Sequence, residues 1–412
     1  MKIDGMESTK AKYKSLVKKV KKACRSARIN REKQLSKNRK SNPKAFYSYI
    51  SSRTKMKSGV GPLCIDENGK KTEIVSEIKI ATELNKYFAS AFQKVDVTAP
   101  LPVTERLNCR MPFTEVIFDE LKVKKAIESL RCDTSPGPDG ISARVLKNMK
   151  EHLSIPIATI LNKTMSGDPI PQQWKRSNVS AIFKKGKKSE VANYRPVSME
   201  SLLCKLGEKI IKNELLDFLT KNKMIKDSQH GFMPGRSTTS NLIEYLDAVS
   251  SALDEGLTMC SIYTDYSKCF DRIPHRLIIH KLQNRYSIDG AVLAWIDDWL
   301  RNRQQRVVLK GEASEWRDVV SGVIQGSVLG PILALMMLDS IDNELTYCAV
   351  SKYADNNKLY AVVKDTADQQ AVQNDLDRVS QWAKRWGFEL NVDKCSIIQF
   401  GGGTPWSFSL NG

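Results

Sequence analysis

Long apolar runs, paired cysteines and clustered histidines are all scarce in this chain of 412 residues. No apolar run approaches the roughly 18–20 residues that a membrane-spanning helix needs, and no signal-peptide pattern is present, so we expect neither a membrane protein nor a secreted one. The nine cysteines are scattered without a C-x-x-C pair, and the four histidines lack metal-ligand spacing. These absences favour reduced, mostly buried thiols in an intracellular protein, nuclear or cytoplasmic, and argue against a zinc site.

Acidic residues are scarce at the N-terminus. Residues 1–58 hold 19 Lys or Arg against three Asp or Glu, which gives 16 of the 19 net positive charges. The few apolar residues between 11 and 40 fall partly at helical spacing, so we expect a basic helix. Such a segment is either a solvated arm or a nucleic-acid-binding arm, because Lys and Arg neutralise phosphates without reading sequence. The candidate binding residues are Lys18, Lys19, Lys21, Lys22 and Arg25.

Two acidic segments stand beside β-prone runs. Asp265 closes the run from Cys260 to Thr264, and the box Tyr353-Ala354-Asp355-Asn356 lies between short apolar stretches that predict a hairpin. Two carboxylates brought together by neighbouring strands would offer the hard oxygen ligands that Mg²⁺ takes. The alternative is that Asp265 only caps a turn. Asn356 tolerates the same turn as Asp but lacks its negative charge.

A glycine-rich segment, Ser321 to Pro331, precedes an apolar run from Ile332 to Leu338. Its glycines at 322, 326 and 330 allow backbone to approach a ligand closely. The run that follows predicts a helix with Pro331 in its first turn. Together with the two acidic segments, this pattern favours a metal-dependent site over a capped turn.

In this order and spacing, the segments resemble the palm of a reverse transcriptase from a non-LTR (LINE-like, jockey/CR1-type) retrotransposon. The resemblance covers roughly residues 115–402, and further motifs of that family carry it. They are Ser135-Pro136-Gly137-Pro138-Asp139-Gly140-Ile141, Phe183-Lys184-Lys185-Gly186, Asn193-Tyr194-Arg195-Pro196-Val197-Ser198, Gln229-His230-Gly231-Phe232, Gly235-Arg236-Ser237-Thr238, Trp386-Gly387-Phe388-Glu389-Leu390-Asn391 and Lys394-Cys395.

The resemblance implies an α+β fold with right-hand polymerase fingers and an antiparallel palm sheet backed by helices. The implied divisions are a helical basic arm at 1–58, a helical N-terminal extension at 59–130, fingers at 131–258, a palm at 259–402 and a truncated tail at 403–412. No thumb fits in that tail, so we expect the thumb to be absent. We also expect Trp295, Trp299, Trp382 and Trp386 to pack in the core rather than stack on bases, and His230 to be structural.

The resemblance also implies a role for each matching residue. Asp265 and Asp355 would bind two Mg²⁺ ions, or Mn²⁺, with Asn356 in the degenerate catalytic position. Contacts to the incoming deoxynucleoside triphosphate would come from six residues, namely Lys185, Arg195, Phe270, Gln325, Gly326 and Lys394. Phe270 would exclude a ribose 2′-hydroxyl, and one lysine of the run 184–188 would reach a phosphate.

The expected function is that of an RNA-directed DNA polymerase domain using an RNA template, a DNA primer and deoxynucleoside triphosphates. Asn356 and the missing thumb predict impaired activity. Ile324 in place of Pro, Cys269 in place of Ala, and Asp339-Ser340 in place of Asn-Asp also depart from the family pattern. The alternative is an inert nucleic-acid-binding remnant. A third interpretation, a maturase or other reverse-transcriptase-like host protein, fits the palm, but the sequence has no segment that distinguishes it.

Overall fold

The computed structural model describes residues 4–39, 41–43, 46, 49, 60–67, 70–93 and 98–410. The chain divides into two compact units, residues 1–61 and residues 62–412. In the first unit, α1 (Asp4–Lys37) is one long helix in the segment where the sequence predicted a basic helix. Within the described residues, no helix is both long and apolar enough to cross a membrane.

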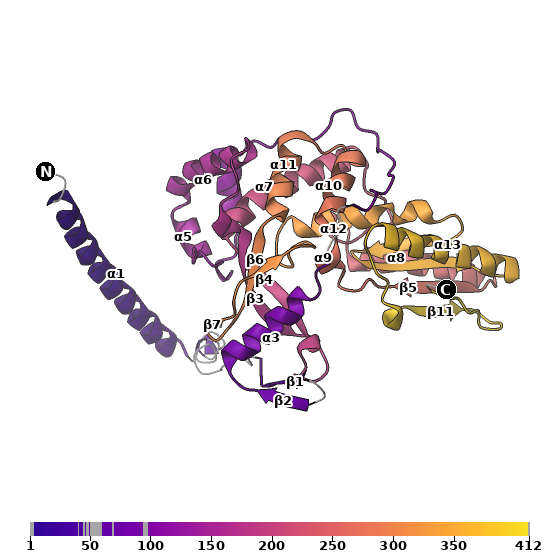
Figure 1. Cartoon of the computed structure of the whole chain (residues 1–412), viewed down its shortest axis with the longest axis horizontal. Coiled ribbons are helices and arrows are strands. Elements are labelled where there is room, and N and C mark those ends of the chain that lie inside the picture. The colour runs from indigo at the N-terminus through magenta and orange to yellow at the C-terminus, as the bar shows by residue number, and fades with distance from the viewer. Residues whose placement is uncertain are drawn as a thin grey trace. The chain divides into compact units, whose positions relative to one another are not determined.

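The second unit mixes helices with short sheets (Figure 1). Its α-helices are α3 (Glu77–Ala89), α4 (Glu120–Glu128), α5 (Ala143–Asn148), α6 (Lys150–Met165), α7 (Leu202–Lys221), α8 (Thr238–Asp254), α9 (Cys269–Arg272), α10 (His275–Asn284), α11 (Gly290–Leu300), α12 (Gly330–Leu338) and α13 (Thr366–Arg385). Its 3₁₀ helices are η1 (Gln172–Lys175), η2 (Val191–Asn193), η3 (Asp339–Glu344) and η4 (Val392–Lys394).

The strands of the described residues form three sheets. They are β1 (Leu63–Glu67), β2 (Lys70–Ile74), β3 (Arg176–Phe183), β4 (Tyr194–Glu200), β5 (Met259–Thr264), β6 (Arg303–Leu309), β7 (Glu312–Ala313), β8 (Arg317–Val319), β9 (Ala349–Tyr353), β10 (Asn356–Val362) and β11 (Ser396–Phe400). One sheet has the order β11-β5-β10-β9 and is antiparallel throughout, as expected of the palm. A second has the order β4-β3-β6-β7 with β8 on β6, and β1 pairs with β2.

The second sheet crosses the predicted division between fingers and palm. Strand β6 comes from the segment assigned to the palm, yet it pairs in parallel with β3. Helix α3 packs along β6 and its neighbours (Figure 1). Asn85 of α3 donates a hydrogen bond to Ser314 and accepts one from Gln305. The N-terminal extension therefore packs against this sheet through α3.

Burial agrees with most of the expected core positions. All four tryptophans expected to pack inside are buried, at 3% exposure or less. His230 is buried as well, between Ser240 and Glu244. On α3, Ile80 is buried, whereas Ile78 is 49% exposed. Of the nine cysteines, four are buried and three are exposed.

A buried carboxylate holds the start of α12, the helix that follows the glycine-rich segment. Glu208 of α7 accepts hydrogen bonds from the backbone N–H groups of Val328 and Leu329, at 2.8 and 3.1 Å. Its other oxygen accepts from the indole N–H of Trp299 at 3.2 Å. Leu329 is the N-cap residue of α12 and Val328 precedes it, so this carboxylate holds the turn that starts the helix and places a negative charge near its N-terminus.

We predict that Glu208→Leu lowers the free energy of unfolding by about 3 kcal/mol or more, because three buried N–H donors lose their acceptor. Chemical denaturation followed by circular dichroism measures this. The matched control is Glu151→Leu on α6, which removes a solvent-exposed partner of Lys124 and should change little. Equal effects of the two substitutions would contradict the prediction.

Candidate active site

The two acidic segments meet because of the pairing between β5 and β10. Thr264, the last residue of β5, lies opposite Asn357 of β10. Asp265 directly follows the end of β5, and Asp355 directly precedes the start of β10. Because the two strands are antiparallel, both carboxylates lie at the same end of the sheet. Ala354, in the turn before Asp355, has a φ of 58°, the left-handed conformation that the tight turn requires.

The two carboxylates influence each other. Burial, and then the negative charge of Asp265, raise the pKa of Asp355 above its usual value. Lys394 of η4 lies 2.7 Å from an oxygen of Asp265 and partly compensates its charge. The backbone N–H of Asn391 donates to the carbonyl of Asp265 at 2.8 Å. The segment Asn391–Lys394 therefore holds Asp265 through both its backbone and its side chain.

Both carboxylates line a cleft of about 840 Å³ in the second unit. Seven residues that the sequence singled out line it together, namely Arg195, Asp265, Phe270, Gln325, Gly326, Asp355 and Lys394. Among the described residues, Lys185 and Asn356 do not line the cleft. Asn356 is exposed, and its amide nitrogen lies 3.5 Å from an oxygen of Asp355.

Lys184 lines the cleft in place of Lys185. It follows directly on the end of β3, and its backbone N–H donates to the carbonyl of Asn193 at 2.8 Å. Burial, and then the nearby charges of Arg195 and Lys394, lower the pKa of Lys184. Lys184, Arg195 and Lys394 therefore face the same space as Asp265 and Asp355.

Gln325 is held against a second buried carboxyl group. Its amide nitrogen donates to both oxygens of Asp271, at 2.9 and 3.0 Å. Burial raises the pKa of Asp271 to about 6, although the hydrogen bonds from Gln325 oppose the shift. The Gln325 carbonyl accepts from the N–H of Ser198 at 2.7 Å, so the glycine-rich segment is tied to β4 as well.

Close backbone contact explains two of the glycines. Gly326 has a φ of 117°, and a Cβ there would lie 2.5 Å from the carbonyl oxygen of Ser198. Gly322 has a φ of 80°, and a Cβ there would lie 2.4 Å from the carbonyl oxygen of Phe270. Any other residue would push the segment away from β4 and from Phe270.

The sequence did not indicate that several further residues line the cleft. Tyr87, Phe92 and Gln93, at and beyond the end of α3, form part of its wall, and the ammonium group of Lys268 lies 4.5 Å from the centre of the Tyr87 ring. The position of Lys268 between Asp265 and Asp271 in the sequence could have indicated that it lies in the cleft. The region around α3 carried none, because its place in the cleft depends on contacts with distant strands.

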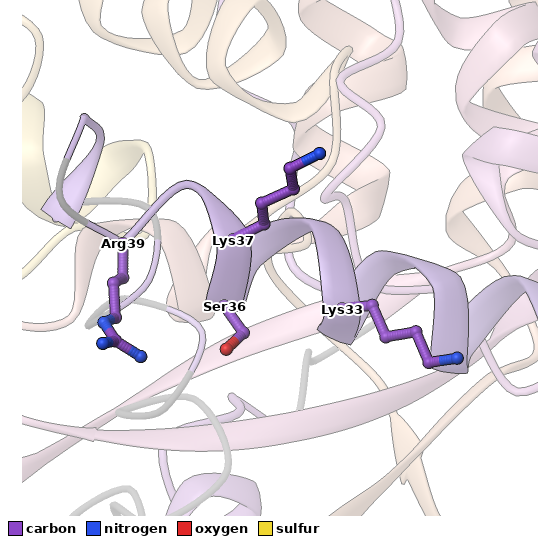
Figure 2. Close-up of a pocket in the computed structure, with 4 residues that line it drawn as sticks. All are labelled: Lys33, Ser36, Lys37 and Arg39. Atoms are coloured by element: carbon purple, nitrogen blue, oxygen red, sulfur yellow. The ribbon is translucent and has the colours of Figure 1, made fainter.

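The first unit carries a separate basic surface. The five candidate binding residues on α1, Lys18 to Arg25, are exposed. Nearer the end of the helix, Lys33, Ser36, Lys37 and Arg39 line a shallow hollow of about 540 Å³, with the side chains spread around the helix (Figure 2). Glu32 is the acid that pairs with Arg28 in this region. The surface is therefore strongly cationic.

Comparison with known proteins bears on these features. Residues 182–407 match the family described as "Reverse transcriptase (RNA-dependent DNA polymerase)". Similar proteins from Drosophila melanogaster include "RNA-directed DNA polymerase from mobile element jockey", which is 27% identical over 73% of this chain and 34% of its own length. "Probable RNA-directed DNA polymerase from transposon BS" is 28% identical over 70% of this chain and 32% of its own length. "Probable RNA-directed DNA polymerase from transposon X-element" is 26% identical over 82% of this chain and 38% of its own length.

The chain thus spans about a third of the length of these curated relatives. The matched region includes β4, both acidic segments, the glycine-rich segment and Lys394, which are the parts that build the cleft. Because the family match covers more than half of the chain and contains the residues of the cleft, this chain belongs to the reverse transcriptase family, among relatives from non-LTR retrotransposons.

Proposed function

We propose that the cleft carries out metal-dependent nucleotidyl transfer, adding deoxynucleotides to a DNA primer on an RNA template. The observation that carries this proposal is the meeting of Asp265 and Asp355 beside the cations Lys184, Arg195 and Lys394 in one cleft. Carboxylates would hold divalent metal ions, and the cations would hold the phosphates of the incoming nucleotide.

The donor chemistry of the site fits magnesium or manganese. Asp265 and Asp355 offer hard oxygen atoms. Burial, and then the charge of Asp265, raise the pKa of Asp355, and a bound cation would favour its charged form. Two bound Mg²⁺ ions would stabilise the attacking and leaving oxygens of an in-line displacement. Within the described residues, no group of three or more His, Cys, Asp and Glu side chains is arranged to hold a metal. The substrate phosphates would therefore supply further ligands.

Asn356 weakens this site. It brings no charge, it is exposed, and its amide nitrogen rather than its oxygen is the atom near Asp355. A neutral side chain at this position leaves two carboxylates for two divalent ions. We therefore infer that metal binding is weaker than in a site with a third carboxylate, and that catalysis is impaired.

The remaining residues of the cleft would position the substrate. Arg195 presents a planar guanidinium suited to two phosphate oxygens, and Lys184 or Lys185 would add a second cation. Lys394 would exchange its present partner Asp265 for the leaving pyrophosphate. Phe270 would exclude a ribose 2′-hydroxyl, and Gln325 with Gly326 would border the base pair being formed.

The second candidate function is binding of nucleic acid without catalysis. Two observations favour it, the amide at position 356 and the exposed cationic surface of α1. A protein that kept the cleft and the basic arm but lost metal-dependent chemistry would still bind a polyanion. The relatives' names describe polymerases, so we place this second.

Catalysis should depend on Asp265. In primer extension on an RNA template with Mg²⁺ or Mn²⁺, Asp265→Ala should lower incorporation by roughly a thousandfold, because metal ligation supplies several kcal/mol of transition-state stabilisation. Asn356→Asp should raise incorporation and lower the metal concentration required. The control is Asp377→Ala on α13, an exposed carboxylate bonded to Gln373 and outside the cleft.

The outcomes separate the two functions. Extension that survives Asp265→Ala cannot come from this cleft. A wild-type chain that stays silent but gains extension with Asn356→Asp locates the defect at position 356. Silence of both chains, together with retained binding of the template–primer duplex, would favour the non-catalytic alternative.

The pH dependence of folding tests the environment of Asp271. Its pKa of about 6 in the folded chain lies above the 3.8 of an ordinary Asp, so the folded state binds the proton more tightly than the unfolded state. This contribution to stability is present at low pH and is lost as pH rises through 6. Relative to Asp271→Asn, the wild type should lose about 2 kcal/mol between pH 4 and pH 7. Urea denaturation at both pH values measures it, and parallel changes in both proteins would contradict the assignment.

The salt dependence of RNA binding tests the role of the basic arm. Replacing Lys18, Lys19, Lys21, Lys22 and Arg25 with Gln should weaken RNA binding and flatten its salt dependence, by about 0.7 in logarithmic slope for each phosphate that is no longer neutralised. Fluorescence anisotropy between 50 and 300 mM salt, roughly the range over which such charges are screened, measures the slope. The control replaces the four lysines with Arg and keeps the charge. An unchanged slope in the Gln variant would mean that the arm does not bind nucleic acid.

A further inference from the structure

Gln229 lies in the segment between α7 and α8 and has no role in the cleft described above. Its side chain is fully buried, at 0% exposure. Its oxygen accepts two backbone hydrogen bonds, from the N–H of Gly231 at 2.7 Å and from the N–H of Ala354 at 3.0 Å. Its nitrogen donates to the carbonyl oxygen of Ala354 at 3.3 Å. One side chain therefore satisfies both backbone polar groups of a single residue.

Ala354 stands next to the carboxylate of Asp355, in the turn of the hairpin. Ala354 directly precedes Asp355 and has a φ of 58°, a conformation that is unfavourable for any residue with a Cβ. The direction in which Asp355 leaves the turn depends on this conformation. The turn itself is too short to supply partners for the polar groups of Ala354, so the fixed geometry comes from outside the hairpin.

The neighbours of Gln229 fix the distance between its segment and the hairpin. The N–H of His230 donates to the carbonyl of Lys352 at 2.9 Å, and the N–H of Lys352 donates to the carbonyl of Ser228 at 2.8 Å. Gly231 lies so close that a Cβ on it would be 2.3 Å from the nitrogen of Ala354. The segment therefore acts as a short added strand along the end of β9.

We propose that Gln229 is a positioning residue for Asp355, because it holds the left-handed turn at Ala354 from which that carboxylate is presented to the metal ions. The proposal rests on the function inferred for the cleft. Gln229 touches neither substrate nor metal in this role. A glutamine that only satisfied the core could bond to any polar group nearby, whereas the side-chain hydrogen bonds of Gln229 go to Ala354 and Gly231.

The test measures Mn²⁺ binding by electron paramagnetic resonance of the free ion, using the full chain without nucleic acid. Gln229→Met keeps the length of the side chain and removes its donor and acceptor. We expect it to weaken Mn²⁺ binding about tenfold, the effect typical of residues that orient a metal ligand. Asp355→Ala sets the scale for complete loss of the ligand.

The matched control is Gln305→Met. Gln305 is also a buried glutamine, but it bonds to Asn85 beside α3, away from the hairpin. It should leave Mn²⁺ binding unchanged. If Gln229→Met binds Mn²⁺ as the wild type does, or if the two Met variants lose affinity alike, the positioning role is wrong. If the wild type and Asp355→Ala bind alike, the metal site itself is wrong, and the positioning role fails with it.

A second variant separates positioning from folding. Glycine adopts a φ of 58° without the cost that Ala354 bears. Adding Ala354→Gly to Gln229→Met should therefore restore Mn²⁺ affinity to within about threefold of the wild type, even where Gln229→Met alone does not fold. A double variant that folds with affinity as weak as that of Asp355→Ala would overturn the proposal.

Discussion

The antiparallel register of β5 and β10 is the constraint on which the cleft depends. Thr264 lies opposite Asn357, and from that pairing Asp265 and Asp355 emerge at one end of the sheet. Side chains alternate between the two faces of a strand, so a slip of one residue would turn each onto the opposite face. The fully buried Ile262 and Leu359 occupy paired positions in the same register, and burying them fixes it.

A second set of contacts brings the other elements of the cleft to these carboxylates. The glycine-rich segment is bound on one side to β4, through Ser198 and Gln325, and on the other to the Phe270–Asp271 segment. These contacts join residues far apart in the chain, and they link one sheet to the other. The parallel pairing of β6 with β3 also joins residues far apart in the chain, and it lies within the sheet that carries Arg195. The cleft is thus a product of long-range packing between two sheets.

Sequence reasoning identified the parts of the site that short motifs carry. Asp265, Asp355, Phe270 and Lys394 stand in segments whose residue types and order are specific, and all four line the cleft. It named Lys185, whereas Lys184 lines the cleft, because the path of the chain after β3 decides which lysine faces inward. Sequence reasoning also did not predict the cleft wall at the end of α3 or the hydrogen bonds between Gln325 and Asp271, since both depend on partners distant in sequence.

The ion pair between Lys394 and Asp265 has a consequence for the order in which ligands arrive. Eight charged side chains line the cleft, five of them cationic (Lys184, Arg195, Lys268, Arg272 and Lys394) and three anionic (Asp265, Asp271 and Asp355). Under the proposed function, a bare divalent ion still binds the carboxylates, but more weakly than a metal–nucleotide complex, because it meets net positive charge and must displace the ammonium group of Lys394. A metal ion travelling with a triphosphate brings an overall negative charge and offers Lys394 a new partner. If the cleft works as proposed, its lining therefore favours arrival of the metal and the nucleotide as a single complex.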